Sequence, residues 1–252
     1  MALVAEGLEV GYKNKPSILQ NLHLEVREGE FLAVLGPNGS GKSTLLRTLA
    51  GVLQPRKGSV LLDGQSTKRF SPENRSRQIG YLPQEIAPAL PYRVDEVVAL
   101  GVKSIARDDA KNIALEIEKA LREVDAHSLS GQLLGELSGG EKRRVLLAGV
   151  LAQKPRFLLL DEPASMLDLG HQSATFRTLS RLSKEGLGII CATHDPNLAL
   201  AHASHMALVD KGKIQAIGKP RAVLASREFK SLYGEAVRFL ELPDGNMAVL
   251  PK

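Results

Sequence analysis

The sequence predicts an α/β fold in which a mixed β-sheet core carries an antiparallel β part and a helical insertion. Three observations predict this fold. A glycine-rich loop at residues 36–44 stands between an apolar run and a helical pattern of leucines. Two further apolar runs, Phe157–Leu160 and Gly188–Thr193, are typical of buried parallel strands. Between these two halves, residues 94–152 space their apolar side chains as helices do, so helices interrupt the sheet.

The same patterns predict how the chain is divided. At 252 residues it is long enough for one large domain or two modest ones. We expect a single domain, with a sheet core in residues 1–86 and 154–218, a helical part in residues 87–153 and a tail in residues 219–252. The prolines in the stretch Ala87–Pro91 are typical of a linker or hinge at the first boundary.

Composition narrows the range of functions. The net charge of +5 modestly favours anionic ligands or an anionic membrane surface. Aromatic residues make up 4% of the chain, so a stacking platform for single-stranded nucleic acid is poorly supplied and no nucleic acid partner is expected. The single cysteine, Cys191, cannot form an internal disulfide, which fits a reducing cytoplasm.

The sequence predicts no membrane segment of its own. The first residues lack the basic region and the long apolar core of a signal peptide. The longest apolar stretches, such as Val145–Ala152, fall far below the ~18 residues that span a bilayer. We therefore expect any membrane role to come through a partner.

The first elements are two strands. Alternating apolar and polar residues predict strands over residues 3–12 and 18–26, separated by a turn at Lys13–Pro16. Tyr12 ends the first strand, where its flat ring could stack on adenine. The alternative is an ordinary half-buried strand tyrosine.

The loop that follows is predicted to cradle phosphate groups. It fits the pattern G-x-x-x-x-G-K-[ST] and consists of Gly36, Pro37, Asn38, Gly39, Ser40, Gly41, Lys42, Ser43 and Thr44. Its glycines let successive N–H groups point into one concavity, where the dipole of the next helix favours anions. We expect Lys42 to reach the β- and γ-phosphates, Ser43 to ligate Mg²⁺ and Thr44 to donate toward the α-phosphate. A glycine-rich turn that merely caps a helix is the alternative.

A strand at Ile79–Leu82 leads to a candidate glutamine. Gln84 leaves this strand and could ligate Mg²⁺ or hold a water beside the γ-phosphate. For a lone glutamine, a solvated loop amide is the alternative.

Inside the helical part, Leu137–Glu141 opens a helix. The spacing of Ser138 and Glu141 satisfies a capping box, so a plain helix start is one interpretation. Two consecutive glycines, Gly139 and Gly140, exceed what a cap needs and expose N–H groups, which indicates a second anion site. The next three residues, Lys142, Arg143 and Arg144, are expected to form a solvated face and only secondarily to steer phosphate.

Polar residues follow two of the predicted buried strands. We expect Asp161 to hold Mg²⁺ through Ser43 and water, and Glu162 to accept a proton from the water that attacks the γ-phosphate. The alternative is an acidic pair that only caps the next helix. His194 ends the neighbouring strand and could hydrogen-bond the γ-phosphate.

The last part of the chain carries no catalytic group. Residues 206–217 predict a closing hairpin, and residues 220–250 predict two short helices and a strand pair around Pro243–Asn246.

Taken together, these motifs resemble the ATP-binding subunit of ATP-binding-cassette (ABC) transporters over residues 2–217. The matching elements are the phosphate loop 36–44, Gln84 of the glutamine loop, the signature Leu137–Glu141, the magnesium strand Phe157–Glu162, the loop Ser165–Asp168 and the switch histidine His194. The signature is the specific part, because phosphate loops alone occur in many unrelated NTPases. The resemblance implies a P-loop NTPase fold of the ABC ATPase type, with ATP and Mg²⁺ as cofactors.

The resemblance also implies a mechanism. ATP is sandwiched between the phosphate loop of one subunit and the signature of a second copy. Ser138, Gly139 and Gly140 would then bind the γ-phosphate in trans, and Asp168 would cross the interface. Tyr12 falls where the family places its adenine-stacking aromatic residue. Gln84 and the adjoining helical part would pass the motion of hydrolysis to a membrane permease.

A narrower resemblance concerns the cargo. The stretches Tyr81–Gln84, Val94–Gly101, Leu167–Gln172 and Val249–Pro251 are similar to ATPases of importers for iron-siderophore, haem or cobalamin. This resemblance implies an integral membrane permease, a periplasmic or lipid-anchored substrate-binding protein, and a peripheral location on the cytoplasmic face of the inner membrane. Three departures, Glu141, Ala164 and Pro196, remove no catalytic group.

Other functions remain as alternatives. The chain could serve a metal-ion transporter or an exporter. It could also be a soluble cassette ATPase acting on nucleic acid or ribosomes, but those usually carry two cassettes or a long coiled-coil insertion, and this chain has neither. A non-hydrolysing regulator is expected to lack Glu162 or His194, and both are present. ATP hydrolysis is therefore favoured.

Overall fold

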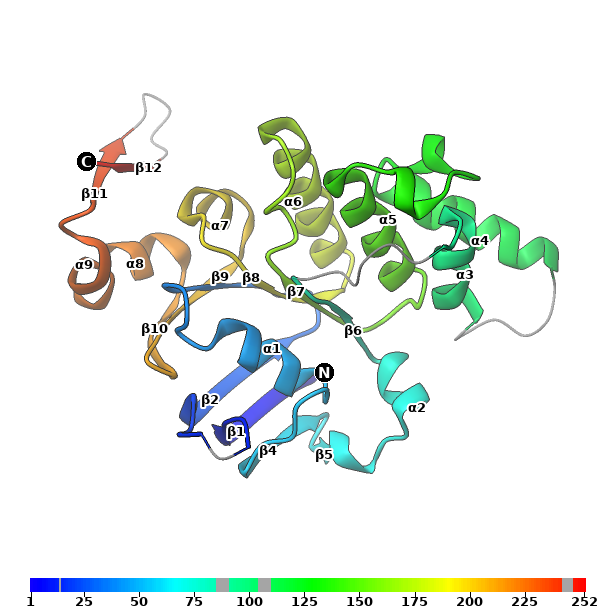
Figure 1. Cartoon of the computed structure of the whole chain (residues 1–252). Coiled ribbons are helices and arrows are strands. Elements are labelled where there is room, and N and C mark those ends of the chain that lie inside the picture. The colour runs from blue at the N-terminus through cyan, green and yellow to red at the C-terminus, as the bar shows by residue number, and fades with distance from the viewer. Residues whose placement is uncertain (14, 85–90, 104–109, 242–246) are drawn as a thin grey trace.

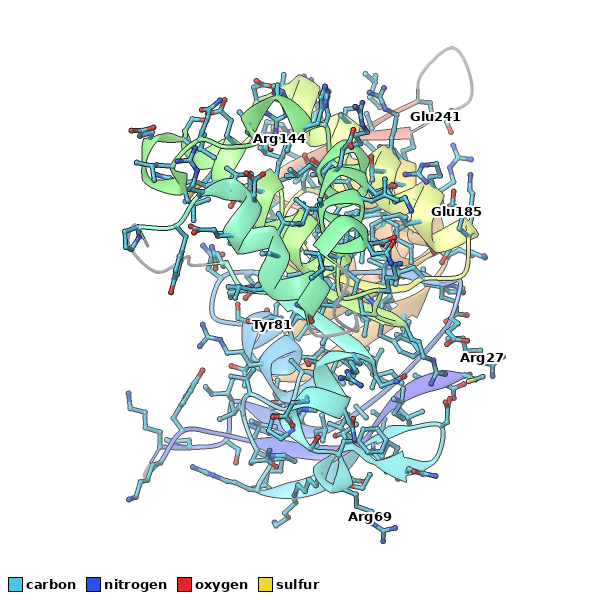
Figure 2. All side chains as sticks on the ribbon, turned by 90° about the vertical axis from the view of Figure 1, so that its right-hand side faces the viewer. Arg27, Arg69, Tyr81, Arg144, Glu185 and Glu241 are labelled. Carbon is cyan, nitrogen blue, oxygen red and sulfur yellow. The ribbon has the colours of Figure 1, made fainter. Side chains whose placement is uncertain are left out.

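The computed structural model describes residues 1–252 except for residues 14, 85–90, 104–109 and 242–246. Two sheets enclose helix α1 (Lys42–Leu49), and a group of helices lies beside the larger sheet (Figure 1). Turned by 90°, the helical part and the smaller sheet lie at opposite ends of the molecule (Figure 2). Within the described ranges, no helix is both long and apolar enough to cross a bilayer.

The smaller sheet is antiparallel and has the strand order β2-β1-β4-β5. Its strands are β1 (Ala2–Val10), β2 (Leu19–Arg27), β4 (Lys57–Leu62) and β5 (Gln65–Ser66). Alternate residues of β2 are buried, as the alternating sequence predicts for a strand with one face on a core. The buried face packs on Leu45, Leu46 and Leu49 of α1. Two short elements, η1 (Thr67–Arg69) and α2 (Pro72–Ser76), lead from this sheet to the larger one.

The larger sheet has the strand order β10-β9-β3-β8-β7-β6. Its strands are β3 (Phe31–Leu35), β6 (Ile79–Leu82), β7 (Phe157–Asp161), β8 (Gly188–Ala192), β9 (His205–Asp210) and β10 (Lys213–Gly218). Neighbouring strands are parallel except for the pair β9 and β10. Every residue of β3, β7 and β8 is buried, which is why their sequences are continuous apolar runs.

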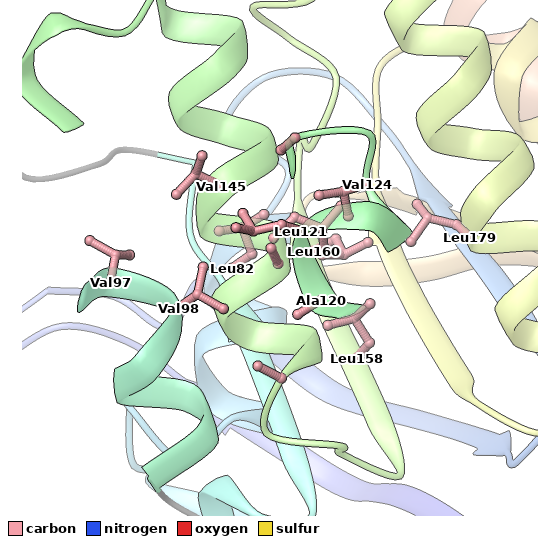
Figure 3. Close-up of a cluster of buried hydrophobic side chains, with 14 of the residues drawn as sticks. Leu82, Val97, Val98, Ala120, Leu121, Val124, Val145, Leu158, Leu160 and Leu179 are labelled. Atoms are coloured by element: carbon pink, nitrogen blue, oxygen red, sulfur yellow. The ribbon is translucent and has the colours of Figure 1, made fainter. Parts of the chain in front are cut away.

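Helices cover the face of the larger sheet that is turned away from α1. They are α3 (Val94–Lys103), α4 (Ala110–Glu123), α5 (Gly139–Leu151) and α6 (Leu169–Lys184), with two short turns, η2 (His127–Leu129) and η3 (Leu134–Glu136). Their apolar side chains form one core with residues of β6, β7 and β8 (Figure 3). The helical part therefore shares its core with the strands that carry the candidate site.

A third core lies under the end of the chain. It joins β3 and β9 to α7 (Pro196–His202), α8 (Pro220–Ala225), α9 (Arg227–Tyr233) and the antiparallel pair β11 (Val237–Glu241) and β12 (Met247–Pro251). The two short helices and the strand pair predicted for the tail are confirmed. The turn predicted at Pro243–Asn246 lies outside the described residues, as does most of the predicted boundary at Ala87–Pro91.

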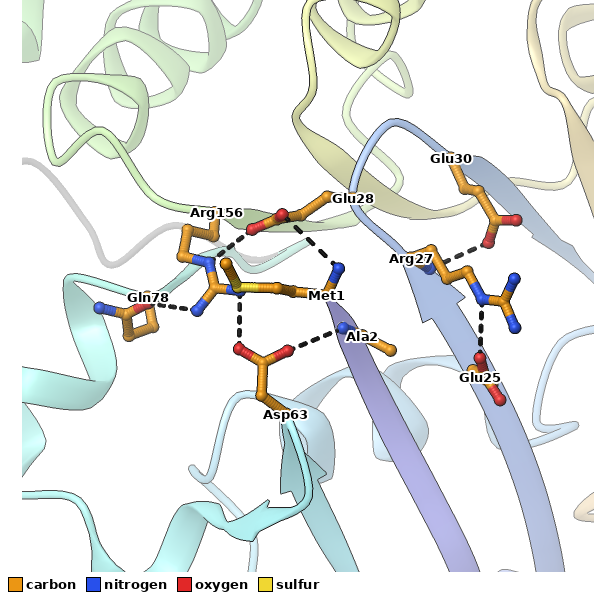
Figure 4. Close-up of polar contacts among 9 residues, drawn as sticks. All are labelled: Met1, Ala2, Glu25, Arg27, Glu28, Glu30, Asp63, Gln78 and Arg156. Carbon is orange, nitrogen blue, oxygen red and sulfur yellow. Dashed lines mark hydrogen bonds and ion pairs between the residues drawn. The ribbon is translucent and has the colours of Figure 1, made fainter.

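A cluster of partly exposed polar groups connects the two sheets (Figure 4). Arg156, at the start of β7, pairs with Asp63 at 2.8 Å and with Glu28. It also donates to Gln78 Oε1 at 3.2 Å, and Asp63 accepts from the backbone of Ala2 at 2.9 Å. The Arg156 guanidinium thus connects the turn that contains Glu28 with the turn that contains Asp63.

Candidate functional site

The site lies at the carboxyl edge of the larger sheet. The parallel register pairs Leu82 with Leu160 and Asp161 with Ala192, so β6, β7 and β8 end at the same edge. The loops that follow these strands and β3 therefore meet there, as in other open α/β sheets. They surround a cavity of about 580 Å³ lined by Ile18, Asn38, Gly39, Ser40, Gly41, Lys42, Ser43, Thr44, Gln84, Glu162 and His194.

A larger hollow of about 730 Å³ lies elsewhere, among α4 and the ends of α5 and α6. Its charged residues are already in ion pairs, for example Lys154 with Glu116 at 2.6 Å and Arg156 with Glu28. Such a lining leaves little net charge for a ligand. The smaller cavity, with its phosphate loop and acidic groups, is therefore the candidate site.

The backbone of the phosphate loop can be formed only with glycine at critical positions. A Cβ on Gly36 would lie 2.1 Å from the carbonyl oxygen of Val209 in β9, and Gly41 adopts φ 108°. Gly41 is the N-cap of α1 and brings no side-chain oxygen to its first turn. The N–H groups at this helix start thus have no competing side-chain cap, which suits them to bind an anion.

Lys42 is held across the loop. Its side chain is buried, and its ammonium donates to the carbonyl oxygens of Gly36 at 2.7 Å and Pro37 at 3.1 Å. Burial lowers the pKa of Lys42, while the nearby carboxylates of Glu162 and Asp161 act in the opposite direction. The charge is therefore fixed in position beside the helix start, where phosphate groups would bind.

Asp161 fits a divalent cation. It is 1% exposed, and neither carboxylate oxygen meets the distance and angle of a hydrogen bond with a described residue. Burial raises the pKa of Asp161; the Ser43 hydroxyl lowers it, and the charge of Glu162 raises it further. A buried carboxylate beside a hydroxyl has the chemistry that fits a hard cation such as Mg²⁺.

Glu162 is held between two side chains from neighbouring strands. Its Oε2 accepts from Gln84 Nε2 at 3.2 Å and lies 3.6 Å from His194 Nδ1. The Glu162 side chain is 12% exposed and that of His194 is 65% exposed. A carboxylate in this position can take a proton from a water that lies in the cavity.

The acidic pair does not cap the next helix. Asp168 is the N-cap of α6, and its carboxylate accepts from His171 N at 2.9 Å and contacts the His171 ring at 2.8 Å. These hydrogen bonds lower the pKa of Asp168. The capping alternative for Asp161 and Glu162 is therefore wrong, because a residue farther along the chain has that role.

The signature forms a capped helix start that is separate from the cavity. Ser138 Oγ accepts from Glu141 N at 3.3 Å, and the Glu141 carboxylate accepts from Ser138 N at 2.8 Å, which completes a capping box. A Cβ on Gly140 would lie 2.9 Å from Leu167, so the second glycine permits close packing on the loop before α6. Neither the signature residues nor Asp168 line the cavity in the described chain.

Tyr12 also lies outside the cavity lining. Strand β1 ends at Val10 rather than at Tyr12, because the chain turns back so that Ile18 N donates to Val10 O at 2.6 Å. The Tyr12 hydroxyl accepts from Arg47 at 3.3 Å, and Arg56 holds the Tyr12 carbonyl at 2.7 Å. Stacking of Tyr12 on adenine stays a prediction.

One expectation is wrong. Arg143 is not on a solvated face but 3% exposed, and its guanidinium donates to the carbonyl oxygens of Pro83, Gln84 and Asp161. Burial lowers the pKa of Arg143, and the charge of Asp161 acts against this. The helical spacing could have indicated it, since Arg143 is one turn from the buried Leu147.

Known proteins resemble this chain in sequence and in fold. A protein-family model described as ABC transporter matches residues 19–165. The chain belongs to the ABC transporter family. The hemin import ATP-binding protein HmuV of Nocardia farcinica (strain IFM 10152) is 40% identical over 239 residues, covering 93% of this chain and 82% of that protein.

Two solved structures support the ABC transporter assignment. The dimeric ABC transporter cassette MJ0796 superimposes with a TM-score of 0.81 at 26% identity, over 87% of this chain and 99% of that one. An inward-facing transporter described as a putative metal-chelate type ABC transporter superimposes with a TM-score of 0.82 at 27% identity. The match covers 100% of this chain and 97% of that one. The predicted family, the fold of a P-loop NTPase of the ABC type and the ATPase activity are confirmed.

Proposed function

We propose that this chain is the ATP-hydrolysing subunit of an importer that takes up an iron complex, haem in the first place, through a membrane permease. The observation that carries the proposal is the meeting of Lys42, Asp161 and Glu162 at one sheet edge. The cargo is supported by the 40% identity to a hemin import ATP-binding protein over 93% of the chain.

The residues of the cavity have distinct roles in hydrolysis. The phosphate loop and Lys42 bind the phosphates of ATP, and Glu162 accepts the proton of the attacking water. Gln84 and His194 orient the Glu162 carboxylate from the neighbouring strands. Ser43, Gln84 and Asp161 are the residues that would hold Mg²⁺, which when bound supplies neutralising charge to the phosphates.

The ATP site is completed by a second copy of the chain. Ser138 and Gly139 are exposed and lie outside the cavity of their own chain, so they are free to contact ATP bound to a partner. The dimeric cassette MJ0796 supports such an assembly. Asp168, which begins α6 beside the signature, would lie in the same interface.

The partners follow from the importer class. The chain would bind an integral permease as a peripheral protein on the cytoplasmic face of the inner membrane. A periplasmic or lipid-anchored binding protein would deliver the cargo. A siderophore or cobalamin importer is the second candidate, supported by the full-length superposition on the metal-chelate type transporter.

The decisive experiment isolates the chain with its native partners. A tagged chain is extracted from its own membranes in mild detergent, and the co-purifying permease is reconstituted in vesicles. Uptake of haem, an iron-siderophore and cobalamin is then measured with ATP supplied on the side of the ATPase, and the same complex carrying Glu162→Gln is the control. We expect ATP-driven uptake of haem by the native complex alone.

The other outcomes are equally informative. Uptake of the siderophore or cobalamin instead of haem would keep the importer and change the cargo. Isolation of an active ATPase without any permease would contradict the importer and favour a soluble cassette function.

A further inference from the structure

Arg143 lies where three parts of the ATPase meet. It is in the second turn of α5, five residues after Ser138 at the start of the signature. Its side chain extends away from the signature toward the ends of β6 and β7. It is 3% exposed, although its neighbours Lys142 and Arg144 retain more contact with solvent.

The contacts of Arg143 cross between two strands. Nη1 donates to the carbonyl oxygens of Pro83 and of Gln84, the latter at 3.1 Å, directly after β6. Nη2 donates to the carbonyl oxygen of Asp161, the last residue of β7. The planar fork of a guanidinium can satisfy acceptors in two segments at once, whereas a lysine ammonium is a single point of charge.

These carbonyls belong to residues of the candidate site. Gln84 donates through its side chain to Glu162 at 3.2 Å, and Glu162 directly follows Asp161. The side chains of Gln84 and Glu162 thus bridge the same two segments whose backbones Arg143 bridges. A shift of either strand end would move the amide away from the carboxylate.

A purely structural role explains this geometry poorly. Taking a guanidinium out of water is unfavourable unless hydrogen bonds compensate it, and an apolar side chain of similar size would often be at least as stabilising in a core. Arg143 also leaves its Nε without a partner among the described residues. What the charged fork provides, and an apolar residue would not, is a fixed spacing between two strand ends.

We propose that Arg143 is a positioning residue for ATP hydrolysis, which fixes the backbones of Gln84 and Asp161 and ties them to the signature helix. The proposal rests on the proposed ATPase function. Arg143 does not touch the nucleotide; it sets the geometry of Gln84 and of Glu162, the proposed general base. It also gives the helix that carries the signature a direct connection to the strand end that carries the general base.

The test uses two variants of the full-length chain, Arg143→Gln and Arg143→Lys, with Arg144→Gln as the matched control. Arg144 is the next arginine of the same helix and also donates to a backbone carbonyl, that of Asp125 at 2.8 Å. This contact stays inside the helical part, and Arg144 lies well away from Tyr81 of β6 (Figure 2). Steady-state kcat and KM, thermal unfolding, and binding of a fluorescent ATP analogue with and without Mg²⁺ are measured for each.

We expect a separation of turnover from binding. Both Arg143 variants should lower kcat by about 10- to 100-fold, the range expected when a reacting group is misplaced. Affinity for the analogue without Mg²⁺ should stay within about twofold of the native chain, because the phosphate loop is untouched. Arg144→Gln should keep the native kcat. Arg143→Lys should fail to restore turnover, since one ammonium cannot span both segments.

Several results would overturn the proposal. A folded Arg143→Gln or Arg143→Lys chain with native kcat would reduce the residue to a structural contact. An equal fold-loss of kcat and of nucleotide affinity would also indicate that Arg143 is only a structural contact. If Arg143→Gln does not fold, the kcat and the nucleotide affinity of Arg143→Lys, measured below the unfolding temperature of that variant, decide between the two roles. Absence of ATPase activity in the native chain would instead contradict the proposed function itself, and the role of Arg143 would fall with it.

Discussion

Glu162 combines a strained backbone with a held side chain. It adopts φ 50°, a region that is unfavourable for residues other than glycine by on the order of 1–3 kcal/mol. The surrounding structure maintains it, because Glu162 N donates to Ala192 O at 3.0 Å and its carbonyl accepts from Ser165 Oγ at 3.1 Å. In this conformation the carboxylate contacts Gln84 and lies 3.6 Å from His194 Nδ1.

Replacement of this carboxylate tests its role as the general base. Glu162→Gln keeps the size of the side chain but cannot accept a proton, so we expect kcat to fall by about 10²- to 10⁴-fold. Binding of ATP should be retained, since Lys42 and the phosphate loop are intact. Phosphate release measures kcat, and equilibrium binding of labelled ATP measures whether ATP binding is retained.

The control is Glu6→Gln, an exposed carboxylate of the same type in β1. It should leave kcat unchanged. Native turnover in the Glu162→Gln chain would assign the proton transfer to another group, whereas loss of ATP binding would mean that the substitution disturbs the loop and not the chemistry.

At the level of elements, the tail is connected to the helix that follows His194. Asn197, in the first turn of α7, donates to Val249 O at 3.0 Å and accepts from Val249 N at 2.8 Å. The N-cap of α7, Asp195, accepts from Asn197 N at 2.7 Å. One side-chain amide thus pairs β12 with the helix that begins two residues after His194.

Removing this amide should loosen the tail. We expect Asn197→Ala to raise the hydrogen-exchange rate of the Val249 amide and to lower the free energy of unfolding by about 1 kcal/mol, the usual size for such a hydrogen bond. Asn197→Asp should also loosen it, because a carboxylate oxygen would face the Val249 carbonyl. Asn74→Ala, at an exposed position in α2, is the control. Equal protection of Val249 in all variants would show that other contacts hold the tail.

Local signals explain why most elements could be predicted from the sequence. The buried strands β3, β7 and β8 are continuous apolar runs, and Ser71 before Pro72 marks the start of α2 with a side-chain cap. The end of β1 could not be read in this way, because it depends on the return of the chain to Val10. The boundary is set by the hydrogen bond between Ile18 and Val10, and the alternation of apolar and polar residues carries no information about that pairing.

Some features of the candidate site could likewise be predicted from the sequence, and others could not. Lys42 and Ser43 belong to a contiguous motif, so the sequence alone suggests their roles. The spacing of α5 could indicate that Arg143 is buried, but its hydrogen bonds to the backbones of Gln84 and Asp161 could not be predicted, because they depend on how α5 packs against the ends of β6 and β7. Nor could the 3.2 Å contact of Gln84 with Glu162, which requires the parallel register of two strands far apart in the chain.

At the scale of the whole molecule, the two parts that we propose to form the ATP site lie apart within one chain. The phosphate loop lines the cavity, whereas Ser138, Gly139 and Gly140 do not. If the site is completed in trans, each site takes its phosphate loop from one chain and its signature from the other. A chain with a defective phosphate loop and a chain with a defective signature can then form one intact site together.

This arrangement predicts recovery of activity on mixing. Lys42→Ala removes the phosphate-binding charge, and Gly139→Asp places a negative side chain in the signature, so each variant alone should be inactive. In a mixed dimer, the intact phosphate loop of one chain faces the intact signature of the other. Random mixing gives half mixed dimers with one complete site each, so turnover should recover to about one quarter of the native rate.

A second mixture makes the result specific to sites formed in trans. Lys42→Ala combined with Ser43→Ala places both defects in the phosphate loop, so that every site of every dimer carries one of them. This mixture should stay inactive under the same conditions. Recovery in both mixtures would indicate subunit-independent rescue, and recovery in neither would mean that each chain hydrolyses ATP with its own signature or that both sites must be intact. Only recovery confined to the first mixture fits an ATP molecule held between a phosphate loop and a partner's signature.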